Sequence, residues 1–90
     1  MVSKYKILIE GFLSGEVPVE TFEKQYLQMF KNQKEPLGPV YFDILNSLFE
    51  SVDAYWGECQ VGQETAFTIS EAQLRADAKE ALQKLKSLEI

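Results

Sequence analysis

The sequence predicts an all-α fold, an antiparallel four-helix bundle with a long loop between the third and fourth helices. Four segments carry apolar residues at the i, i+3, i+4, i+7 spacing of one helical face, and glycine or proline residues separate the first three. Helices with one apolar stripe and short connections pack as antiparallel neighbours. A chain of 90 residues has the length of one domain, so we expect residues 1–90 to form a single helical unit.

The first predicted helix covers residues 3–13, and Ser3 is a candidate cap for its N-terminus. The second starts near Pro18, whose fixed φ suits the first turn of a helix, and has Lys31 and Lys34 near its C-terminal end. The two apolar faces consist of Tyr5, Leu8, Ile9 and Phe12, and of Val19, Phe22, Tyr26, Met29 and Phe30.

The third predicted helix covers residues 39–55, after a proline-containing stretch that prevents the second helix from continuing. Its wide apolar face consists of Val40, Tyr41, Ile44, Leu45, Leu48, Phe49, Val52 and Tyr55. Glu50 and Asp53 fall mainly on the opposite side. Adjacent residues at a helix end point to different sides, so we expect Tyr55 to lie partly in the core and Trp56 to be more exposed.

The fourth predicted helix opens at Ser70 with the sequence SEAQ, a capping box, and ends near Leu88. Its apolar residues recur at helical spacing at Leu74, Ala78, Ala81, Leu82, Leu85 and Leu88. Glu80 and Lys84 form an i, i+4 pair in the favourable order. The helical pattern is therefore consistent from its cap to its last turn.

The connection before this helix, residues 56–69, has no clear periodicity. Loops of this length in compact domains are usually functional or disordered. We expect two of its apolar side chains, Phe67 and Ile69, to pack under the end of the bundle.

Charge is distributed unevenly along the chain, whose net charge is −5. Residues 35–74 contain seven acidic side chains and no lysine or arginine, whereas the other fifty residues carry nine basic and seven acidic ones. A net negative charge argues against direct nucleic-acid binding. An acidic surface without internal cations is suited to a basic partner instead.

Catalysis has little support in the residue types. Histidine, the most frequent general base, is absent, and Cys59 follows Glu58, whose charge raises rather than lowers a thiol pKa. Glu50 and Asp53 lie one helical turn apart, and three roles stay open for them: a solvated face, a partner-binding face or acid–base catalysis. We expect no enzyme activity, no cofactor and no metal site, because the usual zinc ligands and the alternating acids of an EF-hand are missing.

The first thirteen residues, MVSKYKILIEGFL, include three charged side chains and no apolar run near the roughly 20 residues of a membrane span. A single cysteine fits a reducing compartment. We therefore expect a cytoplasmic protein without membrane contact.

An acidic and aromatic surface is expected around the end of the third helix and in the loop after it. The predicted partner-binding residues are Glu50, Asp53, Trp56, Glu58 and Glu64. Tryptophan is enriched at interface hot spots, and carboxylates around it favour a strongly basic partner. Nucleases are such a class, because cationic clefts hold their phosphates and an acidic protein can occupy such a cleft in place of nucleic acid.

Three segments resemble one known family. They are GFLSGEVPVETFEKQY at 11–26, DILNSLFESVDAYWGE at 43–58, and a C-terminal helix of the type EAQLRADAKEALQKL. The second segment matches a family pattern of Leu-Phe, an acid, an aromatic and an acid at Leu48, Phe49, Asp53, Tyr55 and Glu58. In these features, which span most of its length, the chain resembles the bacterial self-protective colicin-like immunity proteins.

The resemblance implies a four-helix antiparallel bundle that binds a cognate toxin domain, one to one as a monomer, and blocks its active site. It also implies that acidic residues imitate substrate phosphates where the toxin is a tRNA-cleaving ribonuclease. The related setting is contact-dependent growth inhibition. Asp53 and Glu58 match acidic positions of the pattern. Trp56 stands where the pattern has an acid, which indicates a different toxin.

Two other functions stay open at this point. Asn46-Ser47-Leu48 is similar to the Asp-Ser-Leu of acyl carrier proteins, although Ser47 lies within a predicted helix rather than at a helix start. A self-associating helical adaptor is the other alternative, and it predicts a stable homo-oligomer.

Overall fold

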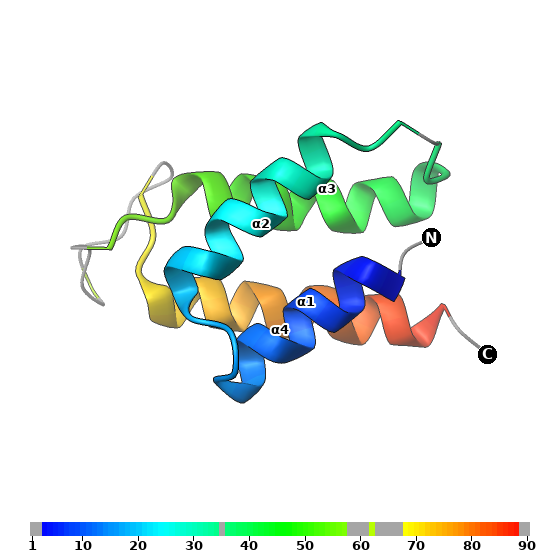
Figure 1. Cartoon of the computed structure of the whole chain (residues 1–90). Helices are drawn as coiled ribbons and strands as arrows, with labels where there is room; N and C mark the ends of the chain where they lie inside the picture. The colour runs from blue at the N-terminus through cyan, green and yellow to red at the C-terminus, as the bar shows by residue number, and fades with distance from the viewer. Residues whose placement is uncertain (1–2, 35, 58–61, 63–67, 89–90) are drawn as a thin grey trace.

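The computed structural model describes residues 3–34, 36–57, 62 and 68–88 (Figure 1). Its helices are α1 (Ser3–Ser14), α2 (Val19–Lys31), α3 (Pro39–Ala54) and α4 (Glu71–Ser87). Successive helices run in opposite directions, and each packs against two neighbours, so that α1 and α3 both contact α2 and α4. The prediction of an antiparallel four-helix bundle with a long connection before its last helix is confirmed.

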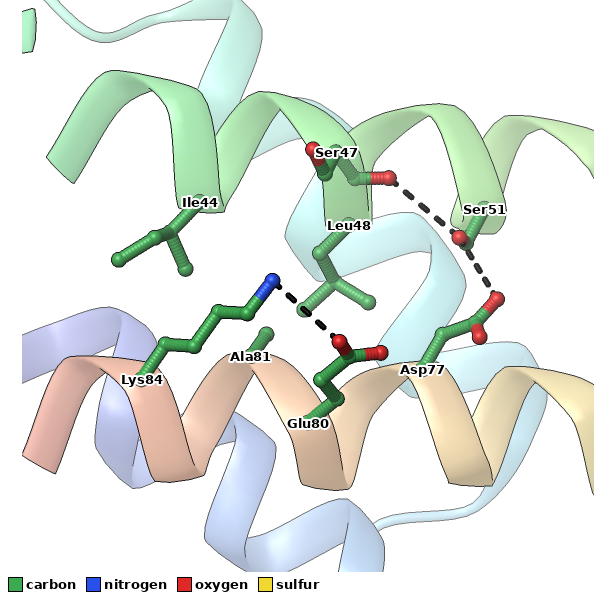
Figure 2. A pocket seen from close by; sticks show the side chains of 8 residues that line it. All are labelled: Ile44, Ser47, Leu48, Ser51, Asp77, Glu80, Ala81 and Lys84. Atoms are coloured by element: carbon green, nitrogen blue, oxygen red, sulfur yellow. Dashed lines mark hydrogen bonds and ion pairs between the residues drawn. The ribbon is translucent and has the colours of Figure 1, made fainter. Parts of the chain in front are cut away.

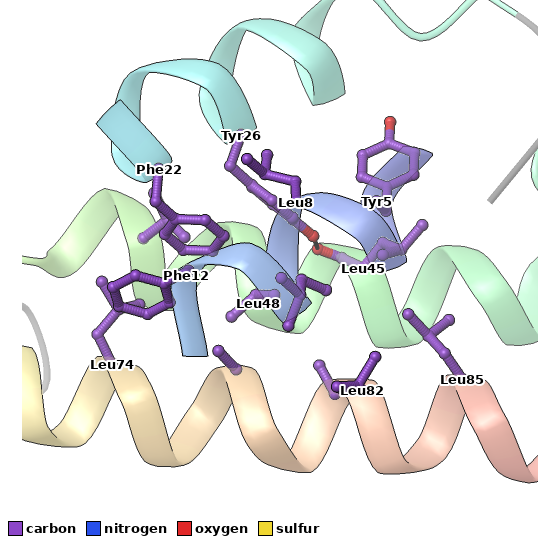
Figure 3. Close-up of a cluster of buried hydrophobic side chains, with 14 of the residues drawn as sticks. Tyr5, Leu8, Phe12, Phe22, Tyr26, Leu45, Leu48, Leu74, Leu82 and Leu85 are labelled. Atoms are coloured by element: carbon purple, nitrogen blue, oxygen red, sulfur yellow. Dashed lines mark hydrogen bonds between the residues drawn. The ribbon is translucent and has the colours of Figure 1, made fainter. Parts of the chain in front are cut away.

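The core is built from the apolar faces of all four helices. The side chains of Phe12 and Phe22 stack with ring centroids 4.2 Å apart (Figure 3). Tyr26 is fully buried, and its hydroxyl donates a hydrogen bond of 2.8 Å to the backbone carbonyl of Leu45. The buried apolar side chains are Tyr5, Leu8, Ile9, Phe12, Val19, Phe22, Tyr26, Leu45, Leu48, Val52, Leu74, Ala78, Ala81, Leu82 and Leu85.

Helix boundaries follow local backbone chemistry. Pro18 is the extended residue before α2, with φ −60° and ψ 154°, and helical geometry begins one residue later. Gly38 precedes α3 with φ 83°, a left-handed conformation that favours glycine, and Pro39 occupies the first turn. The second helix ends at Lys31, earlier than the sequence suggests. Ser3, the candidate cap, is itself the first residue of α1, so that prediction is wrong.

Two residues predicted on apolar faces are exposed instead. Val40 is 54% exposed and Leu88 is 39% exposed. The first lies in the opening turn of α3 and the second directly follows α4, at the same end of the bundle (Figure 1). Helical periodicity continues to the last turn, but a neighbouring helix covers only the part of a helix that lies beside it.

Backbone pairing joins the two ends of the long connection. Tyr55 and Ile69 form a parallel β-bridge, in which the Trp56 N–H donates to the Ile69 carbonyl at 3.1 Å. The Ile69 N–H donates in turn to the Ala54 carbonyl at 3.0 Å. Ile69 packs against the core as predicted, whereas Phe67 lies outside the described residues.

The Ser70 hydroxyl accepts a hydrogen bond of 3.2 Å from the Gln73 N–H, which is the predicted cap of α4. The bridge between Tyr55 and Ile69 and this cap together fix the entry into α4. No helix in the described part of the chain is long and apolar enough to cross a membrane.

Candidate functional site

The C-terminal half of α3 presents two carboxylates to solvent. Glu50 and Asp53 are exposed, whereas Leu48 and Val52 on the other side of the helix are buried in the core. Asn46 Nδ2 donates a hydrogen bond of 3.2 Å to Glu50 Oε1. Neither carboxylate forms an ion pair with any residue that the structure describes. Both carboxylates are therefore accessible to a cationic partner.

An exposed indole follows these acids along the chain, just after the end of α3. The helix ends at Ala54, and Tyr55 turns the chain into an extended conformation with φ −63° and ψ 131°. Tyr55 is half-buried and packs against the core, whereas Trp56 is 58% exposed. The predicted division between core tyrosine and exposed tryptophan is confirmed. The backbone N–H of Trp56 donates to the backbone carbonyl of Ile69. The indole therefore projects from a backbone position that is held by a hydrogen bond.

Three of the five predicted site residues thus lie exposed in the last turns of α3 or directly after it. The other two, Glu58 and Glu64, lie outside the described residues, as does Cys59. In the described part of the chain, no group of three or more His, Cys, Asp or Glu side chains is placed to hold a metal ion. Exposed carboxylates beside an exposed indole are suited to binding a cationic surface.

Other acids surround this end of the bundle. The pKa of Tyr55 is raised by burial first, and then by the negative charges of Glu71, Glu20 and Glu23. These three residues lie near the N-termini of α4 and α2, which meet the C-terminus of α3 at the same end (Figure 1). Sequence reasoning did not place Glu20 and Glu23 at this site. The antiparallel order of the helices was the signal that could have placed them here.

The arginine of α4, Arg75, is already engaged. Arg75 Nε lies 2.9 Å from Glu71 Oε2, and its Nη1 donates a hydrogen bond of 3.0 Å to the Phe12 carbonyl. The guanidinium also lies over the Phe12 ring, 4.5 Å from its centroid. Arg75 therefore balances Glu71, whereas Glu20 and Glu23 have no ion-pair partner among the described residues.

A groove between α3 and α4 adjoins the same face (Figure 2). Its volume is about 150 Å³. It is lined by Ile44, Ser47, Leu48, Ser51, Asp77, Glu80, Ala81 and Lys84. Ser47 is exposed and lies in the middle of α3, unlike the serine at a helix start that carrier proteins modify. Sequence reasoning did not single out Asp77, because its partner Ser51 is 26 residues away.

The family comparison agrees with this arrangement. A family model described as bacterial self-protective colicin-like immunity matches residues 1–85. Comparison with curated proteins and with solved structures gave no match. The family match covers nearly the whole chain, including α1, α2, α3 with its acidic end, and α4 up to residue 85. The chain therefore belongs to the bacterial self-protective colicin-like immunity proteins.

Proposed function

We propose that this immunity protein neutralises a nuclease toxin, with RNA and in particular tRNA as its substrate, by covering the basic active-site cleft. Membership of the family supports binding to a cognate toxin protein. The acidic charge of residues 35–74, which contain no lysine or arginine, supports a basic cleft on the toxin. Nucleases need cationic clefts to hold phosphates, so an acidic surface is complementary to them.

The observation that carries the proposal is the pair of solvent-facing carboxylates in the last turns of α3, without an ion-pair partner among the described residues, followed by an exposed tryptophan. Glu50, Asp53 and Trp56 form the described part of the contact surface. We propose that Glu58 and Glu64 extend it. Carboxylates take the positions of substrate phosphates on toxin lysines and arginines, while the indole buries apolar area at the centre of the contact.

Inhibition of this kind needs no turnover. The protein acts as a stoichiometric plug, monomeric in a one-to-one complex, without a cofactor and without contacting nucleic acid itself. Complementary charge accelerates association, which protects a cell against a toxin present at low concentration. The setting is the cytoplasm of a cell that delivers the toxin to its neighbours, as in contact-dependent growth inhibition.

The test uses the toxin domain encoded beside the gene. Co-expression should protect cells, and the purified protein should stop cleavage of tRNA by that domain. Asp53→Lys should abolish protection, because it places a cation against a cationic cleft, while helicity is kept and the melting temperature does not fall. Asp43→Lys, at the exposed start of the same helix, is the matched control and should protect as wild type does.

Protection against a toxin that leaves RNA intact would overturn the assignment of RNA as the toxin's substrate. It would still support the inhibitory role of this protein. Full protection by Asp53→Lys, Trp56→Ala and Glu50→Lys would overturn the proposed surface.

A further inference from the structure

The groove between α3 and α4 combines a fixed carboxylate with an apolar floor. Asp77 Oδ2 accepts a hydrogen bond of 2.8 Å from the Ser51 hydroxyl, and Asp77 Oδ1 accepts one of 2.8 Å from Gln73 Nε2. Both donors are neutral, and no cation of the described residues pairs with Asp77. The carboxylate is therefore held in place by donors from two helices, with lone pairs left for a further donor.

The floor of the groove is apolar. Leu48 and Ala81 are buried, and Ile44 is half-buried beside them. The volume of about 150 Å³ equals that of an engineered cavity of about 150 Å³ that binds benzene, so it is large enough for a planar group of this size. Apolar walls beneath a charged rim fit a side chain with a methylene stem and a charged head.

A second carboxylate stands at the mouth of the groove. Glu80 Oε1 lies 3.3 Å from Lys84 Nζ, and both side chains are more than half exposed. In Figure 2 the Lys84 ammonium lies over the groove between the two helices. Exposed ion pairs of this kind are weak, so an incoming cation can displace Lys84 and take its place as the partner of Glu80.

We propose that this groove receives an arginine side chain of the toxin, an inference that rests on the proposed function. The guanidinium lies between Asp77 and Glu80, and its stem lies on Leu48 and Ala81. Arginine fits better than lysine because its planar fork matches carboxylates and because it is less strongly hydrated. Ser47 and Ser51, on the groove side of α3, alternate along the helix with Glu50 and Asp53, so a toxin that covers those acids reaches the groove.

The experiment titrates the toxin domain encoded beside the gene into wild type and three variants by calorimetry. Asp77→Asn keeps the shape of the side chain but removes its charge, and should weaken the Kd about tenfold or more. Lys84→Gln removes the competing cation and should tighten the Kd. Asp43→Asn removes one acid from α3 away from the groove, and its Kd for the toxin should stay within about twofold of the wild-type value.

An arginine scan of the toxin then identifies the partner. One toxin Arg→Gln variant should bind the wild-type immunity protein more weakly than the unmodified toxin does. The same toxin variant should bind Asp77→Asn almost as well as the unmodified toxin binds Asp77→Asn, because both changes remove the same contact. Should Asp77→Asn unfold, Glu80→Gln replaces it in the same cycle. Equal losses for every toxin arginine on both backgrounds would overturn the groove as an arginine site.

The two proposals fail differently. Wild-type affinity for Asp77→Asn and Glu80→Gln, together with loss of binding for Asp53→Lys, overturns the groove and keeps the proposed surface. Absence of binding between the wild-type protein and the toxin overturns both.

Discussion

The two ends of this bundle are built from the same four helices but differ in charge. One end gathers the N-termini of α2 and α4 and the C-terminus of α3, with Glu20, Glu23 and Asp53 (Figure 1). The other end carries lysines in the last turns of α2 and α4, among them Lys31 and Lys86. Helix dipoles explain most of this division, because they favour anions at N-termini and cations at C-termini.

The third helix is the exception to that explanation. Its last turn contains Asp53 and no basic residue, so an anion lies where the dipole disfavours it. Exposed aromatic side chains occur at both ends, Trp56 at the acidic end and Phe42 at the opposite one. The difference teaches that charge, rather than exposed apolar area alone, distinguishes the proposed toxin-binding end.

The largest expected effect concerns the core that supports both ends. Phe22 is fully buried and stacks on Phe12, so Phe22→Ala should destabilise the fold by about 3–5 kcal/mol. That is a large part of the about 5–15 kcal/mol available to a typical domain. Thermal unfolding followed by circular dichroism measures it, and an unchanged melting temperature would show that the two ends do not depend on this stack.

A smaller effect separates the two exposed aromatics. Trp56→Ala should weaken toxin binding by about 2 kcal/mol or more, which is about thirtyfold in Kd, because tryptophan anchors bury a large area. Phe42→Ala, at the other end, should leave the Kd unchanged. Calorimetry with the cognate toxin domain measures both. The reverse order of effects would move the binding surface to the lysine-rich end.

The titration of two tyrosines compares the electrostatic fields at the two ends of the bundle. The pKa of Tyr5 is raised by burial alone, whereas that of Tyr55 is raised by burial and by the charges of Glu71, Glu20 and Glu23. Replacing Glu20 and Glu23 by glutamine should therefore lower the pKa of Tyr55 and leave that of Tyr5. A pH titration of the tyrosine Cζ signals by NMR measures both values. Equal shifts in the two tyrosines would contradict a local acidic field.

The smallest effect tests the exception in α3. Asp53→Asn should stabilise the fold by about 0.3–1 kcal/mol, because it removes an anion from a helix C-terminus, while it weakens toxin binding. Glu20→Gln, in the first turn of α2, should destabilise by a similar amount. Urea unfolding of the two variants gives the signs. A loss of stability in Asp53→Asn would mean that Asp53 has a structural role.

The four helices could be predicted from the sequence because each has an apolar stripe and recognisable ends, as the serine cap of α4 shows. The exposed Val40 could not, since its burial depends on where the neighbouring helix ends. The places of Glu20 and Asp77 in the two proposed contact regions could not be predicted either. Each gains its significance from residues distant in the chain, Tyr55 and Ser51, which only packing brings near.

The central claim is that the acidic end of the bundle contacts the toxin, and NMR mapping of the complex tests it most directly. Unlabelled toxin domain is added to the ¹⁵N-labelled protein, and the shifts of backbone amides are followed residue by residue. We expect the largest changes at Glu50, Asp53 and Trp56 and around Glu20. Changes centred on Lys31 and Phe42, with the amides at the end of α3 unaffected, would contradict the claim.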